Sequence, residues 1–223
     1  MAELQTIDIE TGPLPSATLI VLHGLGADGN DFVPLAQQLN LDAVGPVRFV
    51  FPHAPVIPVT INNGYRMRAW YDILGMEAKT REDEAGLRLS RGEIEALLAR
   101  EKQRGIAAHR IVLAGFSQGS AMALLTGLRH KERLAGIAGL SGYLPMAGST
   151  AAERSDANVL TPIFMGHGTQ DEIVNIERGT ASRELLRGLG HDVEWHQYPM
   201  GHSVCMEEIA DLNRWLLKVL AAA

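Results

Sequence analysis

The sequence IVLAGFSQGS at residues 111–120 is expected to combine a strand, a tight turn and the start of a helix. Its first half is rich in β-branched and apolar residues, which predicts a short buried strand. The residues after Gly119 are good helix formers. Between them lies Gly-x-Ser-x-Gly, centred on Ser117. In this context the serine hydroxyl is held clear of the sheet, so the pattern predicts a nucleophile elbow.

The same turn predicts a hydrogen-bond donor for a negatively charged intermediate. The amide of Gln118 comes at the N-terminus of the expected helix, where backbone N–H groups favour an anion. The motif alone is common by chance, and the alternative is that Gly115 and Gly119 only separate a strand from a helix. The rest of the chain must therefore supply a base, an orienting acid and a second donor.

Length and composition are those of a globular protein. The 223 residues are 46% hydrophobic and 21% charged, and no change in composition divides them, so we expect one domain over residues 1–223. The net charge of −6, without a basic run, argues against nucleic-acid binding. No leader and no membrane-spanning run is recognised, and Cys205 is a lone cysteine. These features predict a cytoplasmic protein without stable membrane insertion.

Apolar strands alternate with helical segments along the chain. Strands are expected near residues 18–22, 47–51, 111–115, 134–140, 162–166 and 193–198, with a weaker edge strand at 4–9. Helices are expected at 32–39, 83–104, 120–130, 175–187 and 204–220, and a surface loop at 146–158. Because several strands are apolar on both faces, the pattern predicts an α/β fold with a mainly parallel central sheet and helices on both faces.

Residues 52–79 contain several prolines and show no clear periodicity. Long loops inside compact domains are commonly functional, and the aromatic and methionine residues of this one argue against disorder. We interpret it as a lid-like loop over an apolar pocket. An irregular excursion packed on the core is the alternative. The residues expected to contact a substrate are Met67, Trp70, Leu74 and Met76.

Polar loops follow several expected strands at their carboxyl ends, where functional loops of parallel sheets gather. Three of these loops contain Ser117, Asp171 and His202, in that order along the chain. Imidazole titrates close to neutral pH, so His202 is suited to take a proton from the serine hydroxyl. Asp171 would accept a hydrogen bond from the other ring nitrogen and fix its tautomer. The order matches that of α/β-hydrolases and predicts a catalytic triad.

The remaining histidines and acids are weaker candidates. His167 ends a strand and is expected to shape the Asp171 loop through a local hydrogen bond. Asp156 and Asp192 do not directly follow a buried strand. Cys205 starts a helix without an elbow and is expected to be an inert thiol. His109 and His130 lie at helix ends or in loops and are expected to be solvated. His191 and His196 lie near or inside an alternating strand and are expected to be structural or exposed.

The loop HGLGADG at residues 23–29 follows the first buried strand and offers the second donor. Its glycines let the backbone approach a ligand closely. We therefore predict that the amide of Leu25 acts with the amide of Gln118 as an oxyanion hole, which stabilises the negative charge of a tetrahedral intermediate.

Residues 24–29 also match Gly-x-Gly-x-x-Gly, a fingerprint of dinucleotide binding. A dinucleotide-dependent oxidoreductase is therefore one alternative. It ranks lower because the next strand ends at Phe51 without an acidic residue for a ribose, and because Asp28 would repel a pyrophosphate. A catalytically silent binding protein of the same fold is another alternative. No compact spacing of histidines and acids predicts a metal site, and no cofactor is expected.

With these residues in place, the chain resembles the carboxylesterase and acyl-protein thioesterase (lysophospholipase-like) branch of α/β-hydrolases. The matching segments are LHGLGADGNDF at 22–32, FPHAP at 51–55, WYD at 70–72, GFSQG at 115–119, GYLP at 142–145, HG with Asp171 at 167–171, and GH at 201–202. Two positions depart from the usual pattern. Ser120 stands where a second glycine is usual after the elbow, and Glu172 stands where a proline often follows the acid. Both flank the expected catalytic positions.

The resemblance implies a Ser117, His202 and Asp171 triad, an oxyanion hole at Leu25 and Gln118, an acyl pocket under the loop, and often a homodimer. We expect a metal-free serine carboxylesterase for esters of short to medium chain length. Ser117 would attack the carbonyl, His202 would pass the proton to the leaving group, and water would release the acid. Small-molecule esters, acyl thioesters, lysophospholipids and acylated proteins present the same electrophile and stay open as substrates.

Overall fold

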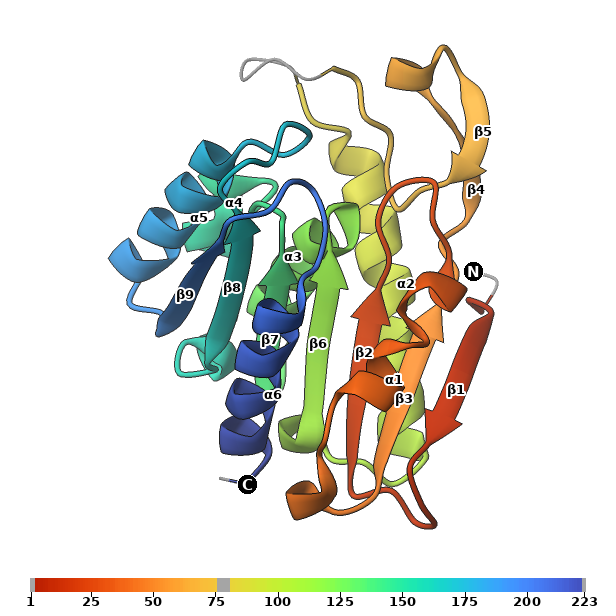
Figure 1. The fold of residues 1–223 in the computed structure, drawn as a ribbon. Helices are drawn as coiled ribbons and strands as arrows, with labels where there is room; N and C mark the ends of the chain where they lie inside the picture. Colours follow the sequence, from red (N-terminus) through yellow and green to blue (C-terminus); the bar gives the residue numbers. More distant parts are fainter. Residues whose placement is uncertain (1–2, 76–80, 222–223) are drawn as a thin grey trace.

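The computed structural model describes residues 3–75 and 81–221. It is built on a seven-stranded sheet in the order β1-β3-β2-β6-β7-β8-β9 (Figure 1). The strands are β1 (Thr6–Glu10), β2 (Ala17–Leu22), β3 (Val47–Pro52), β6 (Ile111–Phe116), β7 (Gly136–Leu140), β8 (Ile163–Gly168) and β9 (Val193–Tyr198). The edge strand β1 pairs antiparallel with β3, and all other pairs in this sheet are parallel. The predicted, mainly parallel sheet is confirmed.

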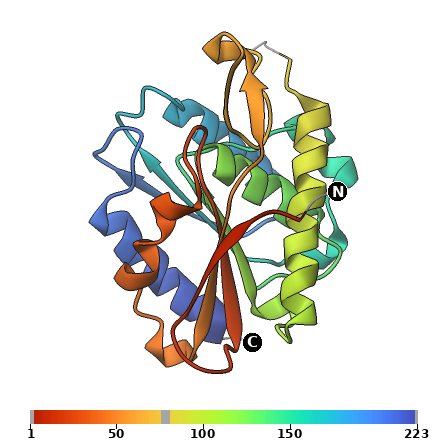
Figure 2. The same cartoon turned by 90° about the vertical axis from the view of Figure 1, so that its right-hand side faces the viewer.

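Helices cover both faces of the sheet. Most strands have apolar residues on both faces, so both faces must be shielded from water. On one face lie α2 (Glu84–Gln103), α3 (Gln118–Arg129) and α5 (Ile176–Gly188), and on the other lie α1 (Leu35–Gln38) and α6 (Met206–Ala221). Figure 2 shows the sheet between α2 and α6. Each face has its own apolar core. Within the described residues, no helix is long and apolar enough to cross a membrane.

Two segments expected from the sequence differ in the structure. The expected helix at 32–39 is a 3-10 turn over Gly29–Phe32 (η1) followed by the single turn α1, whose N-cap is Pro34. The expected surface loop at 146–158 contains α4 (Ala147–Glu153) and a 3-10 turn over Asp156–Asn158 (η5). The serine and threonine in α4 have low helix propensity, so the sequence does not predict this helix. The Arg129 guanidinium donates hydrogen bonds to the hydroxyls of Ser149 and Thr150 and thereby anchors α4.

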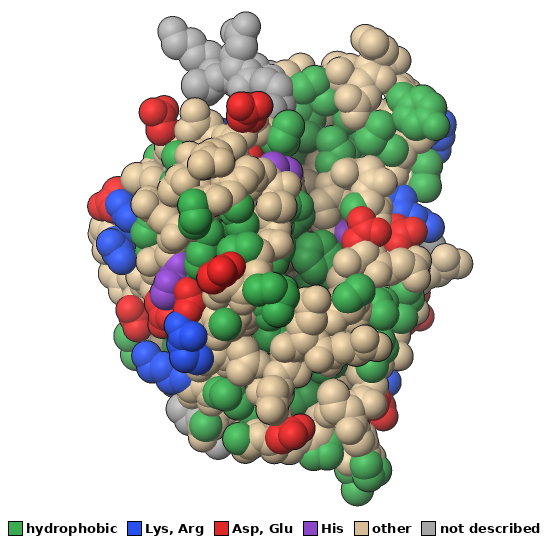
Figure 3. Space-filling model, in the orientation of Figure 1, with side chains coloured by type: hydrophobic (Ala, Val, Ile, Leu, Met, Phe, Trp, Pro, Cys, Tyr) green, Lys and Arg blue, Asp and Glu red, His purple; other side chains and the backbone are tan. Residues whose placement is uncertain are grey.

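The loop predicted at 52–79 contains a β-hairpin. Its strands β4 (Val56–Val59) and β5 (Tyr65–Arg68) are joined through a 3-10 turn over Thr60–Asn62 (η3) and stand above the carboxyl ends of the sheet (Figures 1 and 2). Hydrophobic side chains gather over this part of the surface in Figure 3. The strands are only four residues long, and Pro58 lies inside the first of them, so the sequence gives a weak signal for either strand.

A buried ion-pair network fastens α2 to the edge of the sheet. The carboxylate of Glu101 is fully buried and accepts hydrogen bonds from Arg48 Nη1 at 2.9 Å and Thr18 Oγ1 at 3.0 Å. Arg104 Nη1 donates to the other oxygen of Glu101 at 2.9 Å. Arg48 Nε also donates to Glu10 of β1 at 2.8 Å. The network therefore links α2, β3 and β1.

Candidate active site

Ser117 occupies the sharp turn between β6 and α3. Its backbone has φ 56° and ψ −117°, a conformation that costs energy for a residue with a side chain. A methyl group on Gly115 would lie 2.2 Å from the carbonyl oxygen of Gly119, so the strand and helix meet too closely for any other residue there. Ser117 N–H donates to Leu140 of β7 at 2.9 Å. The turn has the strand–turn–helix form predicted from the sequence.

The imidazole of His202 lies between the hydroxyl of Ser117 and the carboxylate of Asp171. His202 Nε2 is 2.9 Å from Ser117 Oγ, and its Nδ1 is 2.7 Å from Asp171 Oδ2. The three side chains come from the loops after β9, β6 and β8. The ring of Phe116 lies 4.8 Å from the His202 ring and supports it from the side. The structure thus brings together the three residues that the sequence selects.

The carboxylate of Asp171 is buried, and both its oxygens are satisfied. Oδ1 accepts the amides of Ile173 at 2.9 Å and Val174 at 2.8 Å, which leaves Oδ2 for the Nδ1–H of His202. With the proton on Nδ1, Nε2 is free to accept the proton of the serine hydroxyl. The three side chains thus form a continuous chain of hydrogen bonds from the Ser117 hydroxyl through the His202 ring to the Asp171 carboxylate.

His167 shapes this loop, as the sequence predicts. Its Nε2 donates to the carbonyl of Val174 at 2.8 Å and lies 3.5 Å from Asp171 Oδ2. Burial lowers the pKa of His167, so the ring is neutral at neutral pH and acts as a hydrogen-bond donor. The bond holds the Val174 amide where it can donate to Asp171.

Of the two predicted oxyanion donors, Leu25 lies in the 23–29 loop and Gln118 is the first residue of α3. A methyl group on Gly24 would lie 3.3 Å from Cβ of Ser117, so the 23–29 loop passes directly beside the serine. No backbone carbonyl among the described residues accepts the N–H of Leu25 or Gln118. These two amides are therefore available to an anion formed next to Ser117.

A buried histidine shapes the first of these loops. His23 Nδ1 lies 2.7 Å from the carbonyl of Gly24, and Nε2 accepts the amide of Ala54 at 3.0 Å. Burial lowers the pKa of His23, which keeps the ring neutral and suits one donor and one acceptor nitrogen. Its contact with Ala54 joins distant parts of the chain, so only its position at the end of a strand could have indicated this role.

The residues predicted to contact a substrate lie in different environments. The sequence places Trp70 on the wall of a pocket, but the structure buries its side chain in the core, with 1% exposed. Met67 is half-buried and faces the 23–29 loop, since a methyl group on Gly26 would lie 3.6 Å from the Met67 sulfur. Leu74 is 42% exposed. Met76 lies outside the described residues.

The alternative candidates lie elsewhere. His130 is buried, not solvated as expected, because Nδ1 is paired with Glu95 at 2.7 Å. Cys205 is half-buried, and burial raises the pKa of its thiol, which fits an inert cysteine. Among the described residues, no three His, Cys, Asp or Glu side chains are grouped to hold a metal ion.

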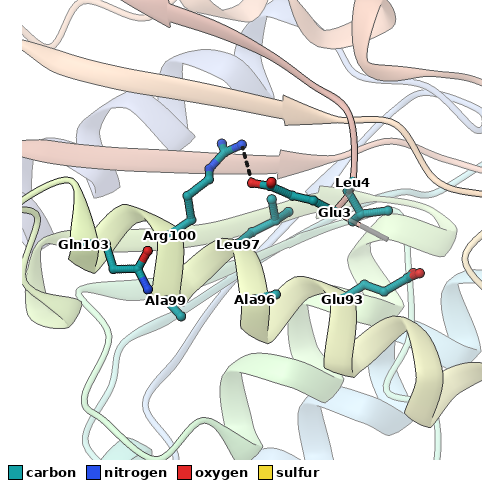
Figure 4. A pocket seen from close by; sticks show the side chains of 8 residues that line it. All are labelled: Glu3, Leu4, Glu93, Ala96, Leu97, Ala99, Arg100 and Gln103. Atoms are coloured by element: carbon teal, nitrogen blue, oxygen red, sulfur yellow. Dashed lines mark ion pairs between the residues drawn. The ribbon is translucent and has the colours of Figure 1, made fainter. Parts of the chain in front are cut away.

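A groove of about 350 Å³ lies away from these loops, between the N-terminal segment and α2. Figure 4 shows Glu3 and Arg100 facing one another across it, 3.8 Å apart. Its lining side chains belong to the segment before β1 and to α2, and none of them comes from the loops that carry Ser117, Asp171 or His202. The groove therefore takes no part in the candidate site.

The sheet topology, the elbow and the Ser–His–Asp arrangement together define an α/β-hydrolase of the serine type. A family model described as phospholipase/carboxylesterase matches residues 7–220. The chain belongs to this family and is a serine hydrolase of carboxylic esters, which confirms the family and the enzyme class predicted from the sequence.

Individual relatives agree with this assignment. The chain is similar to acyl-protein thioesterase 1 of Gibberella zeae, with 43% identity over 92% of this chain and 91% of the relative. Among solved structures, Arabidopsis thaliana SOBER1 superimposes with a TM-score of 0.87, 30% identity, and coverage of 92% of this chain and 99% of that one. Zea mays acyl-protein thioesterase 2 superimposes with a TM-score of 0.86, 27% identity, and coverage of 97% and 99%.

Proposed function

We propose that Ser117, His202 and Asp171 are the catalytic triad of this hydrolase and that it cleaves acyl thioesters as well as carboxylic esters. The observation that carries the proposal is the pair of hydrogen bonds at the His202 ring: Nε2 accepts from the Ser117 hydroxyl at 2.9 Å, and Nδ1 donates to Asp171 at 2.7 Å. The names of the relatives support the thioester substrate.

The reaction follows from the positions of these groups. His202 Nε2 takes the proton as Ser117 Oγ bonds to the carbonyl carbon, and the Leu25 and Gln118 amides stabilise the resulting oxyanion. The tetrahedral intermediate collapses as His202 gives the proton to the departing alkoxide or thiolate. Water, deprotonated by His202, then adds to the acyl-enzyme, and collapse of that second intermediate releases the acid and restores the serine.

The experiment is to compare wild type and Ser117→Ala on a panel of esters and thioesters of graded chain length. Loss of about 10⁶-fold in kcat, the size of effect known for a triad nucleophile, supports the assignment. Retained activity in a folded Ser117→Ala protein rejects it. The panel also tests the preference for short to medium acyl chains that Met67 and Leu74 suggest.

The dinucleotide alternative finds little support in the 24–29 loop. The turn that follows it, η1, spans four residues and not a long helix, and Asp28 already accepts the amide of Asn30 there at 2.8 Å. A pyrophosphate would meet a carboxylate where it needs free N–H groups. Addition of NAD(P)H should therefore leave the protein's absorbance and activity unchanged.

The lid, the homodimer and the cytoplasmic location stay predictions. Exposed apolar side chains on the hairpin and beyond it, such as Tyr65 at 71% and Leu74 at 42%, could face either a substrate or a second subunit. Sedimentation of the purified protein at micromolar concentration tests the dimer directly, and a single species at the monomer mass would reject it.

A further inference from the structure

The segment of residues 68–71, which begins at the last residue of the hairpin, contacts both the 23–29 loop and Gln118, which carry the proposed oxyanion donors. We call it the bridge segment. The sequence predicts a lid for the region that contains the bridge segment, yet the Trp70 side chain within the segment is buried. Its hydrogen bonds run to the two sides of the serine.

On the first side, the bridge segment holds the loop that carries the Leu25 amide. Trp70 Nε1–H donates to the carbonyl of His23 at 2.9 Å. The N–H of Gly26 donates to the carbonyl of Arg68 at 2.9 Å. These two bonds flank Leu25 on either side in the chain, so the position of its amide is fixed from both directions.

On the second side, the bridge segment holds the residue that carries the other amide. Trp70 N–H donates to Gln118 Oε1 at 2.8 Å, and Gln118 Nε2 donates to the carbonyl of Tyr71 at 2.7 Å. Both polar atoms of the buried Gln118 side chain are therefore committed to the backbone of the bridge segment. The side chain takes no part in the proposed chemistry, which uses only the Gln118 amide.

The bridge segment is itself anchored to the helical layer behind it. The hydroxyl of Ser90, a buried residue of α2, donates to the carbonyl of Trp70. The Trp70 ring also packs beside the His23 ring, with centroids 5.3 Å apart. Trp70 thus uses its amide, its carbonyl and its indole N–H at once, each on a different element.

We propose that Trp70 is a positioning residue that sets the separation between the Leu25 and Gln118 amides. The inference rests on the proposed function, because it requires those amides to bind the oxyanion. An oxyanion hole stabilises the transition state only when its donors are already placed where the negative charge develops. The bridge segment ties both donors to one buried residue, through the indole N–H of Trp70 on the Leu25 side and through its backbone N–H on the Gln118 side, and so supplies that placement without touching the substrate.

The test is Trp70→Phe, which keeps a buried aromatic ring and removes the indole N–H. We expect kcat on a short-chain ester to fall about 10-fold to 100-fold, less than the loss of a whole oxyanion donor, with KM within about twofold. The acid limb of the pH profile of kcat/KM, which reports the imidazole, should not move.

A trifluoromethyl ketone provides the readout that a purely structural role would not change. Ser117 Oγ adds to its carbonyl carbon, the proton passes to His202, and the resulting oxyanion lies in the proposed hole. The inhibition constant of this compound should rise in Trp70→Phe by the same factor as kcat falls.

Trp215→Phe is the matched control. Trp215 is equally buried, but it lies on α6 and packs against Gly136 at the start of β7. Its kcat and inhibition constant should stay within twofold of wild type, whatever happens to its melting temperature. Gln118→Met is the second variant, since it keeps the backbone amide and removes both side-chain hydrogen bonds. It carries the same two expectations if Trp70→Phe does not fold.

Two outcomes overturn the inference. One is a folded Trp70→Phe or Gln118→Met protein whose kcat and inhibition constant both match wild type. The other is an equal kinetic loss in Trp215→Phe. Failure of the proposed function is distinguishable, because it requires that wild type fails to hydrolyse the ester or that Ser117→Ala remains active.

Discussion

Gly119 at the start of α3 lies directly against the carbonyl oxygen of Leu22 at the end of β2. A methyl group on Gly119 would come within 2.1 Å of that oxygen and within 2.6 Å of the carbonyl oxygen of His23. The second glycine of the elbow is therefore required by the neighbouring strand, and not only by the turn. This contact holds the start of α3 against the end of β2 and the beginning of the 23–29 loop.

Gly119→Ala should accordingly lower the free energy of unfolding by about 3 kcal/mol, since a backbone atom cannot move aside as a flexible side chain can. Gly148→Ala is the matched control. Gly148 is an exposed residue of α4 with open space around the added methyl group, and its replacement should stabilise the protein by about 0.5 kcal/mol. Urea denaturation of both variants checks the contrast, and equal stabilities would contradict it.

Asp171→Asn should lower kcat by about 10⁴-fold with little loss of stability. An asparagine can present an N–H to His202 Nδ1, which favours the wrong tautomer and leaves Nε2 protonated toward Ser117. Steady-state kinetics on a short-chain ester measure the effect. Asp192→Asn, at an exposed acid that ranks as an alternative on sequence alone, should leave kcat unchanged. If the two variants behave alike, Asp171 is not the orienting acid.

Stability should fall as pH rises because of Glu208. This carboxyl lies in the first turn of α6, is fully buried against Gly166, and neither oxygen has a hydrogen-bond partner among the described residues. Burial raises its pKa to about 8 from the usual 4.5. Between these two values the folded state binds more protons than the unfolded state, so the free energy of unfolding decreases with pH.

Glu208→Gln removes this penalty. Its free energy of unfolding should match wild type near pH 4.5 and exceed it increasingly up to about pH 8, by about 1.4 kcal/mol for each pH unit at most. Above pH 8 the difference should stay constant. Denaturation at pH 5, 7 and 9 measures it. Glu207→Gln, the same change at an exposed neighbour, should show no such growth with pH; a parallel rise in both would contradict the assignment.

Glu101→Gln should destabilise the fold by about 3 kcal/mol, because it leaves Arg48 and Arg104 without the buried carboxylate that they share. The matched control is Glu184→Gln on the surface of α5, where the ion pair with Arg183 is largely exposed and should contribute less than about 1 kcal/mol. Thermal unfolding distinguishes the two. If only Glu184→Gln lost stability, the buried Glu101 network would not be the stronger of the two interactions.

Much of the fold and of the triad could be predicted because the signals are local. Runs such as 19–22 are apolar at every position, which is the pattern of a strand buried on both faces. The loops holding Ser117 and Asp171 each follow such a strand, the loop holding His202 follows the alternating strand β9, and parallel topology gathers all three at one end of the sheet. The order along the chain then selects these residues from their rivals.

The bridge segment could not be predicted in the same way. Trp70 is 47 residues from His23 and 48 from Gln118, and hydrogen bonds between side chains and distant backbone leave no periodic trace in a sequence. The sequence shows that residue 70 is a tryptophan, but it does not show that the side chain is buried.

The hairpin at 56–68 could not be predicted for another reason. Its two strands have only four residues each, which is too few to establish an alternating pattern.

Both outermost strands of the sheet carry charged side chains. Asp8 and Glu10 on β1 are held by arginines, and Glu194 on β9 lies 2.9 Å from His196. If a strand from another molecule paired with β1 or β9, these charged side chains would lose part of their hydration, which is unfavourable. The protein is thereby protected against edge-to-edge aggregation at both ends of the sheet, and the paired charges should help it remain dispersed when concentrated.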